Sequence, residues 1–167
     1  MTKTIIGVMG PGGDATPEED LRAAFELGRL VAHEGWVLLT GGRAAGVMDA
    51  ASRGAKEAGG LTVGILPQSD CDAVSSAVDI AIVTGMGQAR NNINVLSSHV
   101  VVACGMGAGT ASEIALAVKA RKPVILLGAN ETSRAFFKTL GGDRVFTCDA
   151  PHEAIALARA LCSDDKT

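Results

Sequence analysis

The chain has 167 residues and a formal net charge of −3, so it carries no overall positive charge that would attract nucleic acid or an anionic membrane. A hydrophobic content of 47% is enough for one buried core, and the length is typical of one domain. Aromatic residues make up only 3%, which leaves no platform for stacking single-stranded bases. Composition therefore excludes a disordered chain and argues against nucleic-acid and membrane partners.

Short apolar runs rich in β-branched residues alternate with longer helical patterns along the chain. The runs predict strands at 4–9, 36–39, 62–66, 80–83, 100–103, 124–127 and 145–147. The longer patterns predict helices at 17–34, 46–58, 88–97, 110–121, 133–140 and 152–161. This alternation is typical of right-handed βαβ units. We expect a single α/β domain over 1–162, a doubly wound parallel sheet with helices on both faces, and a flexible tail at 163–167.

Two helix starts carry the spacing of a capping box. Thr16 and Glu19 enclose Pro17, as expected for an N-cap hydroxyl, a proline at the first helical position and a reciprocal carboxylate. Thr110 and Glu113 repeat the same spacing. Glu113 is therefore either a capping partner or a functional carboxylate, and the sequence leaves both interpretations open.

Cysteine and histidine do not form a metal site in the sequence. The four cysteines are Cys71, Cys104, Cys148 and Cys162, and they have neither the paired spacing nor the nearby histidines of a zinc site. We expect no metal ligand from the chain, and we interpret Cys104 as a core residue. The first apolar run is too short for a signal sequence, so we expect a cytoplasmic protein.

Eleven of the 21 glycines lie in loops that follow four of the predicted strands. These eleven are Gly10, Gly12, Gly13, Gly41, Gly42, Gly46, Gly85, Gly87, Gly105, Gly107 and Gly109. The carboxyl ends of parallel strands lie along one edge of a sheet, where ligands bind in open α/β folds. We therefore expect four glycine loops to converge on one cleft.

The cleft is expected to bind an anion. Glycine lets backbone N–H groups approach a phosphate closely, and the following helix directs its positive end to the same place. Arg43 in GGRAAG and Arg90 in GMGQARNN could each clamp an oxyanion, although either could instead be a solvated surface residue. The first loop does not complete a GxGxxG pattern, and no acidic residue follows the second strand, which disfavours NAD.

Three segments carry a resemblance to a known superfamily. They are TGGRAAGVMDAASRGA, GMGQARNNINVLSS and GMGAGTASEIALA. Together they resemble the Rossmann-like proteins once described as lysine decarboxylases, which include the Lonely Guy phosphoribohydrolases. The second and third segments are most similar to those of molybdenum cofactor carrier proteins. The resemblance runs from the first strand to about residue 123 and continues more weakly to the end.

The hydrolase branch of this superfamily provides one functional hypothesis. The resemblance implies that Glu113 and Arg90 would cleave the N-glycosidic bond of a nucleoside 5′-monophosphate. Gly105 and Met106, however, stand where the hydrolase motif has Pro and Gly, and Asn91 stands where it has Lys. The lost cation would weaken stabilisation of charge at the phosphate or the reacting centre, which argues against hydrolysis.

The carrier branch provides the preferred hypothesis. It implies a cytoplasmic protein that binds molybdenum cofactor, a phosphorylated pterin with a dithiolene-bound oxometal, and protects it from oxidation. Transient contact with molybdoenzymes would follow. The amides of Gln88, Asn91 and Asn94 suit oxo groups and pterin edges, although they could be ordinary helix surface. The residues predicted to bind the cofactor are Gly10, Gly12, Gly13, Gly41, Gly42, Arg43, Gly46, Met86, Gln88, Arg90, Asn91, Asn94, Gly107, Gly109, Thr110 and Glu113.

The helix predicted at 110–121 is apolar around much of its circumference. Ile114, Leu116 and Val118 are spaced too closely to share one narrow stripe, so we expect two sides of this helix to be buried. One side would meet the sheet and the other a second copy of the chain. We therefore expect a homodimer or homotetramer assembled through the helices at 88–97 and 110–121, as the resemblance also suggests.

Overall fold

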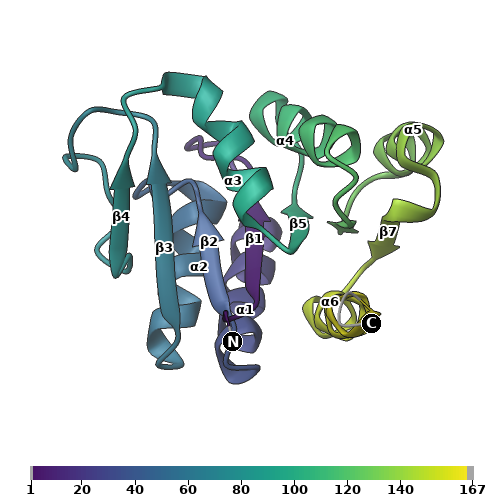
Figure 1. The fold of residues 1–167 in the computed structure, drawn as a ribbon, viewed down its shortest axis with the longest axis horizontal. Coiled ribbons are helices and arrows are strands. Elements are labelled where there is room, and N and C mark those ends of the chain that lie inside the picture. The colour runs from purple at the N-terminus through teal and green to yellow at the C-terminus, as the bar shows by residue number, and fades with distance from the viewer. Residues whose placement is uncertain (1, 165–167) are drawn as a thin grey trace.

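The computed structural model describes residues 2–164, which form a seven-stranded parallel sheet covered by helices on both faces (Figure 1). The strands are β1 (Ile5–Met9), β2 (Val37–Thr40), β3 (Leu61–Leu66), β4 (Ile80–Val83), β5 (Val100–Cys104), β6 (Val124–Leu127) and β7 (Val145–Cys148). Their order across the sheet is β4-β3-β2-β1-β5-β6-β7. The expected doubly wound α/β fold is confirmed, and each predicted strand is present within one residue at either end.

Helices connect most of the strands, although residues 67–79 join β3 to β4 without one, and several helices differ from the prediction. They are α1 (Glu18–His33), α2 (Gly46–Glu57), α3 (Asn91–Ser97), α4 (Ala108–Lys119), α5 (Glu131–Gly141) and α6 (Pro151–Asp164). The single helix expected at 88–97 is divided into a 3-10 turn, η1 (Gly87–Arg90), and α3. A second 3-10 turn, η2 (Gly142–Arg144), follows α5. Helix α4 begins two residues earlier than predicted, which changes the interpretation of Thr110 and Glu113.

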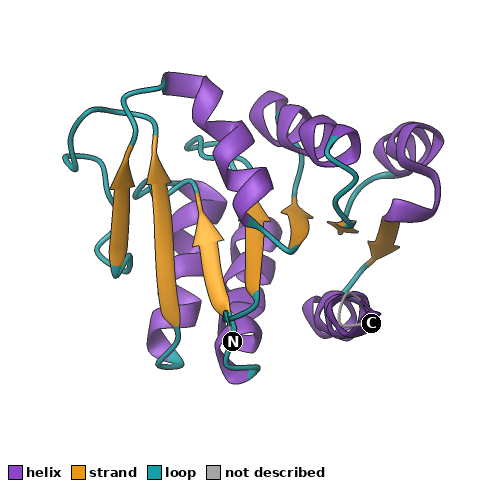
Figure 2. Cartoon of the chain, in the orientation of Figure 1, coloured by secondary structure: helices purple, strands orange, loops and turns teal. Residues whose placement is uncertain are grey.

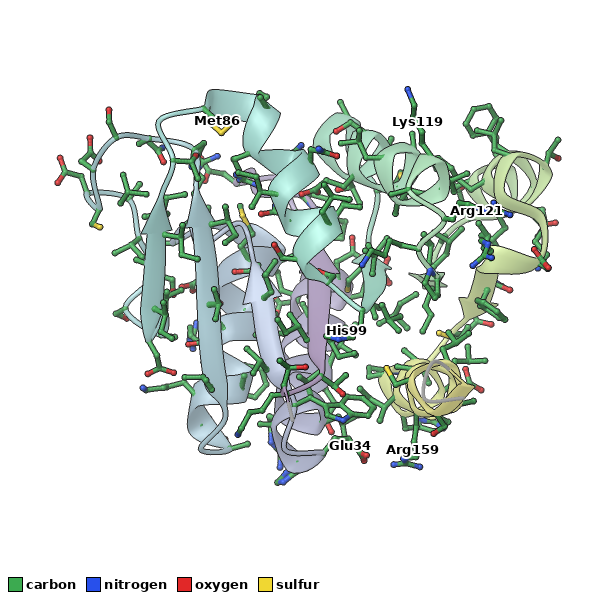
Figure 3. All side chains as sticks on the ribbon, viewed as in Figure 1. Glu34, Met86, His99, Lys119, Arg121 and Arg159 are labelled. Atoms are coloured by element: carbon green, nitrogen blue, oxygen red, sulfur yellow. The ribbon has the colours of Figure 1, made fainter. Side chains whose placement is uncertain are left out.

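Alternating strand residues build two separate hydrophobic layers, one on each face of the sheet, beneath the helices that Figure 2 shows on both sides of the strands. On β1, Ile6 and Val8 pack with residues of α1, α2 and α6, whereas Met9 packs with residues of α3, α4 and α5. Central strands buried on both faces explain why the sequence shows continuous apolar runs rather than strict alternation. The ion pair between Glu34 and Arg159 links α1 to α6 at the edge of one layer (Figure 3).

The direction of winding reverses between β1 and β5. From β1 the chain adds β2, β3 and β4 to one side, and then returns to place β5 on the other side of β1. The loops that leave β1 and β5 therefore diverge at their carboxyl ends, and a crevice opens between them. This topology places the glycine segment after β1 opposite the N-terminus of α4.

The predicted capping box at Thr16 is wrong. Helix α1 begins at Glu18 after Pro17, and no side chain caps it by a hydrogen bond. The Thr16 hydroxyl instead donates to the Gly13 carbonyl oxygen at 2.7 Å, which closes the turn at the end of the glycine loop. Acidic residues in the first turn, including Glu19, complement the positive end of the helix without a reciprocal hydrogen bond.

The C-terminal helix extends into the region expected to be a tail. Helix α6 continues through Ser163 to Asp164, and positions 165–167 of the expected tail lie outside the described residues. Among the helices that the structure describes, none combines the length and the apolar character needed to cross a membrane.

Candidate functional site

A cavity of about 410 Å³ lies at the carboxyl ends of β1, β2 and β5, beside the point where the winding reverses. The residues that line it are Val8, Met9, Gly10, Gly12, Gly13, Gly41, Arg43, Met48, Gln88, Arg90, Asn91, Gly109, Thr110 and Glu113. Most of the predicted ligand-binding residues therefore meet in one cavity, although β1, β2, β5 and η1 lie far apart in the sequence. This cavity is called the central cavity below.

Five predicted site residues do not line the central cavity. Gly42 has a positive φ of 75° and packs against Gly64, so its role is in the backbone turn. Gly46 lines a neighbouring pocket, Met86 lines a surface groove, and Gly107 is the N-cap of α4. Asn94 lies behind the wall of the cavity, where it contacts Glu113 rather than the cavity itself.

The glycine loop after β4 does not converge with the other three. Gly85 and Gly87 have positive φ angles and lie outside the central cavity, since β4 is the edge strand of the sheet. Gly87 instead begins η1, the turn that carries Gln88 and Arg90 back toward β1 and β2. The expectation of four converging loops is therefore wrong for this one, because its glycines shape a connection.

Sequence reasoning missed three apolar residues of the central cavity. Val8 and Met9 are the last residues of β1, and Met48 lies in the first turn of α2. The position of Val8 and Met9 at the end of a strand could have identified them. Met48 gave no chemical signal, because an apolar residue near a helix start is usually a core residue.

Glu113 and Arg90 form a buried pair within the central cavity. Arg90 Nη1 lies 3.7 Å from Glu113 Oε1, and the two side chains are each 8% exposed. The same Nη1 donates to Asn91 Oδ1 at 3.0 Å, and Asn94 Nδ2 donates to Glu113 Oε1 at 2.8 Å. Residues of η1, α3 and α4 thus hold one carboxyl and one guanidinium side by side.

Burial dominates the ionisation of both partners. It raises the pKa of the Glu113 carboxyl, while the hydrogen bond from Asn94 and the charge of Arg90 oppose that shift. Burial also lowers the pKa of Arg90; the carboxylate opposes this change, and the charge of Arg43 adds to it. The effect of Arg43 on Arg90 indicates that two positive charges share the site, which favours an anionic ligand.

Three side-chain donors at the central cavity have no partner among the described residues. They are the buried atoms Arg90 Nε, Arg43 Nε and Thr110 Oγ1. Buried polar groups are almost always hydrogen-bonded in folded proteins, so unpartnered ones indicate a missing ligand or solvent. The N-terminus of α4 adds backbone N–H groups at the same place, with no side chain capping them.

The capping-box interpretation of Thr110 and Glu113 is wrong. Helix α4 begins at Ala108 after the N-cap Gly107, so Thr110 is already inside the helix. Glu113 lies one turn further on, where its side chain lines the central cavity. The helix starts early because Gly107 adopts an extended conformation that serves as the cap without a side-chain oxygen. Glu113 is therefore a residue of the cavity.

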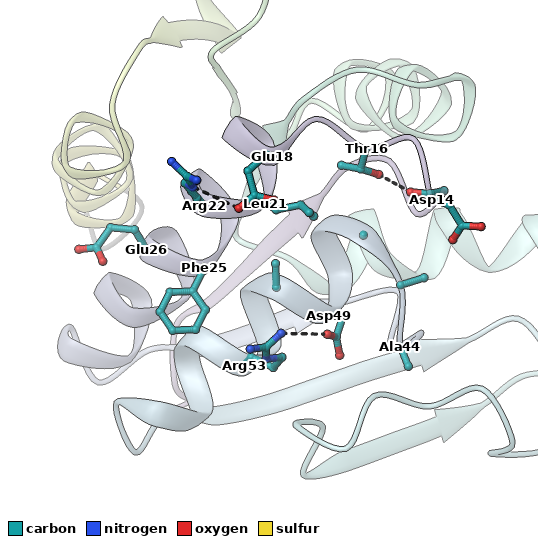
Figure 4. A pocket seen from close by; sticks show the side chains of 14 residues that line it. Asp14, Thr16, Glu18, Leu21, Arg22, Phe25, Glu26, Ala44, Asp49 and Arg53 are labelled. Atoms are coloured by element: carbon teal, nitrogen blue, oxygen red, sulfur yellow. Dashed lines mark hydrogen bonds and ion pairs between the residues drawn. The ribbon is translucent and has the colours of Figure 1, made fainter.

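A second pocket lies between α1 and α2, on the far side of the first glycine loop (Figure 4). Its volume is about 590 Å³, and the Phe25 ring forms part of its wall. The charged side chains there pair within their own helices: Arg22 with Glu18 at 3.2 Å, and Arg53 with Asp49 at 3.9 Å. Because these charges already have partners, the central cavity is the better candidate for binding an anion.

No cysteine is among the described residues that line the central cavity. Cys104 packs in the hydrophobic layer beneath α1, and burial raises the pKa of its thiol to about 12. A thiol with that pKa stays protonated near neutral pH and is a poor metal ligand. Within residues 2–164, no three His, Cys, Asp or Glu side chains lie close enough together to hold a metal ion.

Comparison with known proteins identifies the family. A model of the SLOG cluster4 family matches residues 3–155. The chain belongs to the SLOG cluster4 family. This match and the structural neighbours below confirm the expected likeness to the lysine-decarboxylase-like superfamily and to molybdenum cofactor carrier proteins.

Solved structures similar to this SLOG cluster4 chain include two molybdenum cofactor proteins. A molybdenum cofactor binding protein of Rippkaea orientalis is 59% identical, with a TM-score of 0.94, over 97% of this chain and 99% of that chain. The molybdenum cofactor carrier protein of Chlamydomonas reinhardtii is 54% identical, with a TM-score of 0.93, over the same shares of the two chains. An uncharacterized protein of Archaeoglobus fulgidus is 43% identical over 90% of this chain and 91% of its own length.

Proposed function

We propose that this protein is a carrier of molybdenum cofactor, which binds the phosphorylated pterin in the central cavity and protects it from oxidation. The observation that carries the proposal is the set of unpartnered donors, Arg90 Nε, Arg43 Nε and Thr110 Oγ1, at the N-terminus of α4. The high identity to carrier proteins over nearly the whole chain supports this cofactor over other phosphorylated ligands.

The residues of the central cavity fit the chemistry of the cofactor. Thr110, the N–H groups of residues 107–110 and Arg90 would hold the terminal phosphate, which prefers charge-assisted donors. Gln88 and Asn91 contribute neutral amides that suit oxo groups and the pterin edge. The cofactor would bring its own dithiolene sulfur ligands to molybdenum, so the protein need not supply a cysteine.

A second candidate is hydrolysis of a nucleoside 5′-monophosphate, which the contact between Arg90 and Glu113 favours. Asn91 argues against it, since its amide oxygen accepts a hydrogen bond from Arg90 at the position where the hydrolases carry a lysine. Without that cation the site has one fewer positive charge near the 5′-phosphate of the substrate or the reacting centre. The carrier function therefore remains the better supported of the two.

Identification of the bound molecule tests the proposal. The protein should be purified without oxygen from cells grown with molybdate, and the released small molecule should be identified by mass spectrometry. A phosphorylated pterin in the wild-type protein, lost in the Arg90→Ala variant, is the expected result. Recovery of a nucleotide instead, together with release of free base from AMP, would overturn the carrier function in favour of hydrolysis.

We also propose that a second copy of the chain covers a groove between η1, α3 and α4. This groove has a volume of about 1010 Å³ and an apolar lining that includes Ala89, Leu116 and Met86, the last of which is labelled in Figure 3. Leu96 of α3 is also exposed, and so are Ile80 and Ile82 of β4, whose register partners in β3 belong to the hydrophobic layer on the α3 and α4 face of the sheet. Surfaces of this kind are typical of subunit interfaces.

Three further statements remain predictions. The cytoplasmic location rests on the sequence, and transient contact with molybdoenzymes rests on the proposed carrier role. The single ligand-binding domain over 1–162 is supported by the continuous seven-stranded sheet.

A further inference from the structure

The central cavity contains a carboxyl group where an anion is expected to bind. Glu113 is 6% exposed, and it lines the same cavity as Arg43, Arg90 and Thr110. An ionised carboxylate at this place would repel a phosphate or an oxometal group and would compete for the guanidinium of Arg90. The positive charges of the arginines therefore do not by themselves remove the repulsion between an ionised Glu113 and a bound anion.

The groups around Glu113 are either positively charged or neutral. Arg90 on η1 and Arg43 after β2 carry the positive charges of the cavity, while α3 contributes the neutral amide of Asn94. Thr110 of α4 is neutral, and β1 and α2 present glycines and apolar side chains. The carboxyl is therefore the one acidic group among the residues that line the cavity.

The hydrogen-bond geometry leaves room for a proton on this carboxyl. Asn94 Nδ2 and Arg90 Nη1 both approach Oε1, at 2.8 Å and 3.7 Å. The other oxygen, Oε2, can carry a proton without disturbing the contact with Asn94. Burial already raises the pKa of Glu113, so the free protein favours the neutral form more than an exposed glutamate would.

We propose that Glu113 binds the anionic ligand as a neutral carboxyl, so that ligand binding takes up one proton from solvent. The proposal rests on the proposed function only in placing the anion in the central cavity. The proton on Oε2 is donated in a hydrogen bond to an oxygen of the ligand, and Oε1 keeps the hydrogen bond from Asn94. Arg90 is then released from pairing with Glu113 and can donate to the ligand.

Proton uptake makes binding depend on pH in a defined direction. Because the complex binds one proton more than the free protein, affinity increases as pH falls. Over the interval between the pKa of Glu113 in the free protein and its higher pKa in the complex, affinity should change about tenfold for each pH unit. A carrier of this kind holds its cargo more tightly in acidic conditions.

Sulfate is a suitable probe because it does not itself titrate near neutral pH. Its binding to the full chain should be measured by calorimetry from about pH 5.5 to about pH 8, in two buffers with different heats of ionisation. The wild-type protein should take up about one proton per sulfate. Glu113→Gln, which keeps a neutral hydrogen-bonding side chain, should bind sulfate with no proton uptake and no dependence on pH.

A matched control is Glu57→Gln, which removes the same charge from an exposed position at the end of α2. It should behave as the wild-type protein does. Infrared difference spectra of the wild-type protein provide a second readout that needs no variant, since sulfate addition should increase the band of a protonated carboxyl. Wild-type binding without proton uptake, or unchanged pH dependence in Glu113→Gln, would overturn the proposal. Absence of sulfate binding at every pH would instead overturn the anion site itself.

Discussion

Asn94 and Glu113 join α3 to α4 through one buried hydrogen bond, in which Asn94 Nδ2 donates to Glu113 Oε1 at 2.8 Å. Asn94 is fully buried, and its own Oδ1 has no partner among the described residues. The hydrogen bond to Glu113 is therefore what the Asn94 side chain contributes, and it orients the Glu113 carboxyl. This contact fixes a side chain that lines the central cavity, whereas the next residue of α4, Ile114, belongs to the hydrophobic layer.

Replacing Asn94 by Ala should destabilise the protein. The change removes the donor to a buried carboxyl and leaves that oxygen less well satisfied, which costs about 1–3 kcal/mol in free energy of unfolding. Urea denaturation measures the loss. Thr132→Ala, at an exposed position of α5, is the control and should change stability by less than about 0.5 kcal/mol. Equal stability of the two variants would show that the hydrogen bond has no structural role.

Replacing Arg90 by Ala should weaken binding of the phosphorylated ligand by roughly 2–5 kcal/mol, as expected for a buried, charge-assisted contact. Calorimetry with the isolated cofactor measures the effect, and circular dichroism checks that the fold is retained. Arg53→Ala removes an arginine from the neighbouring pocket, where it pairs with Asp49, and should bind as the wild-type protein does. If Arg90→Ala binds with unchanged affinity, the phosphate lies elsewhere.

Two glycines near α4 should respond differently to substitution. Gly109 has no atom within 4 Å of the position where a Cβ would be placed, and it lines the central cavity. Gly109→Ala should therefore fold with equal or greater stability but bind the ligand less well. Gly105 has a φ of 73°, and its Cβ would collide with the Asp20 carboxyl. Gly105→Ala should lose about 1–2 kcal/mol of stability. Thermal denaturation and calorimetry on both variants separate the two roles.

Leu116→Asp should dissociate the proposed oligomer, because it places a charge in the apolar groove between α3 and α4. Sedimentation measures the change in mass. Since Leu116 also contacts the hydrophobic layer, Leu96→Asp provides a second test at a side chain that is 53% exposed. If both variants sediment as well-folded oligomers of wild-type mass, the interface lies on another surface.

Stability of the ligand-free protein should depend on pH through Glu113. Burial raises the pKa of this carboxyl above its ordinary value of 4.5, so the folded protein holds the proton more tightly than the unfolded chain. The stabilisation from protonation is complete below 4.5 and is lost as pH rises through the higher pKa of the folded state. Urea denaturation across this range should show wild-type stability falling relative to Glu113→Gln as pH rises. A constant difference between the two proteins would contradict the prediction.

The sequence predicted the sheet well and the helix starts less well, for physical reasons. Strand positions such as 80–83 and 124–127 follow from β-branched runs bounded by glycine and proline, and these signals are local. The start of α4 was predicted less well, because the T-x-x-E pattern of Thr110 and Glu113 indicates an N-cap at Thr110. In the structure the backbone of Gly107 serves as the N-cap instead.

The position of the central cavity followed from glycine and arginine placement, because strand topology brings three of the four glycine loops together regardless of side-chain detail. The side chains that contact the Glu113 carboxyl could not be predicted from the sequence. The contact between Asn94 and Glu113 depends on the packing of α3 against α4, and η1 turns Arg90 inward by a local break in the helix. Met48 was missed because apolar residues carry no chemical signal at a binding site.

Three residues form a wall shared by the central cavity and the apolar groove: Gln88, Asn91 and Gly109 line both. Asn91 also connects Arg90 on the cavity side to Ser112 on the groove side through successive hydrogen bonds of 3.0 and 3.2 Å. A second copy of the chain in the groove would contact residues that also line the central cavity. The residence time of the ligand should therefore lengthen or shorten with total protein concentration, so that dilution alone changes how quickly the cargo leaves.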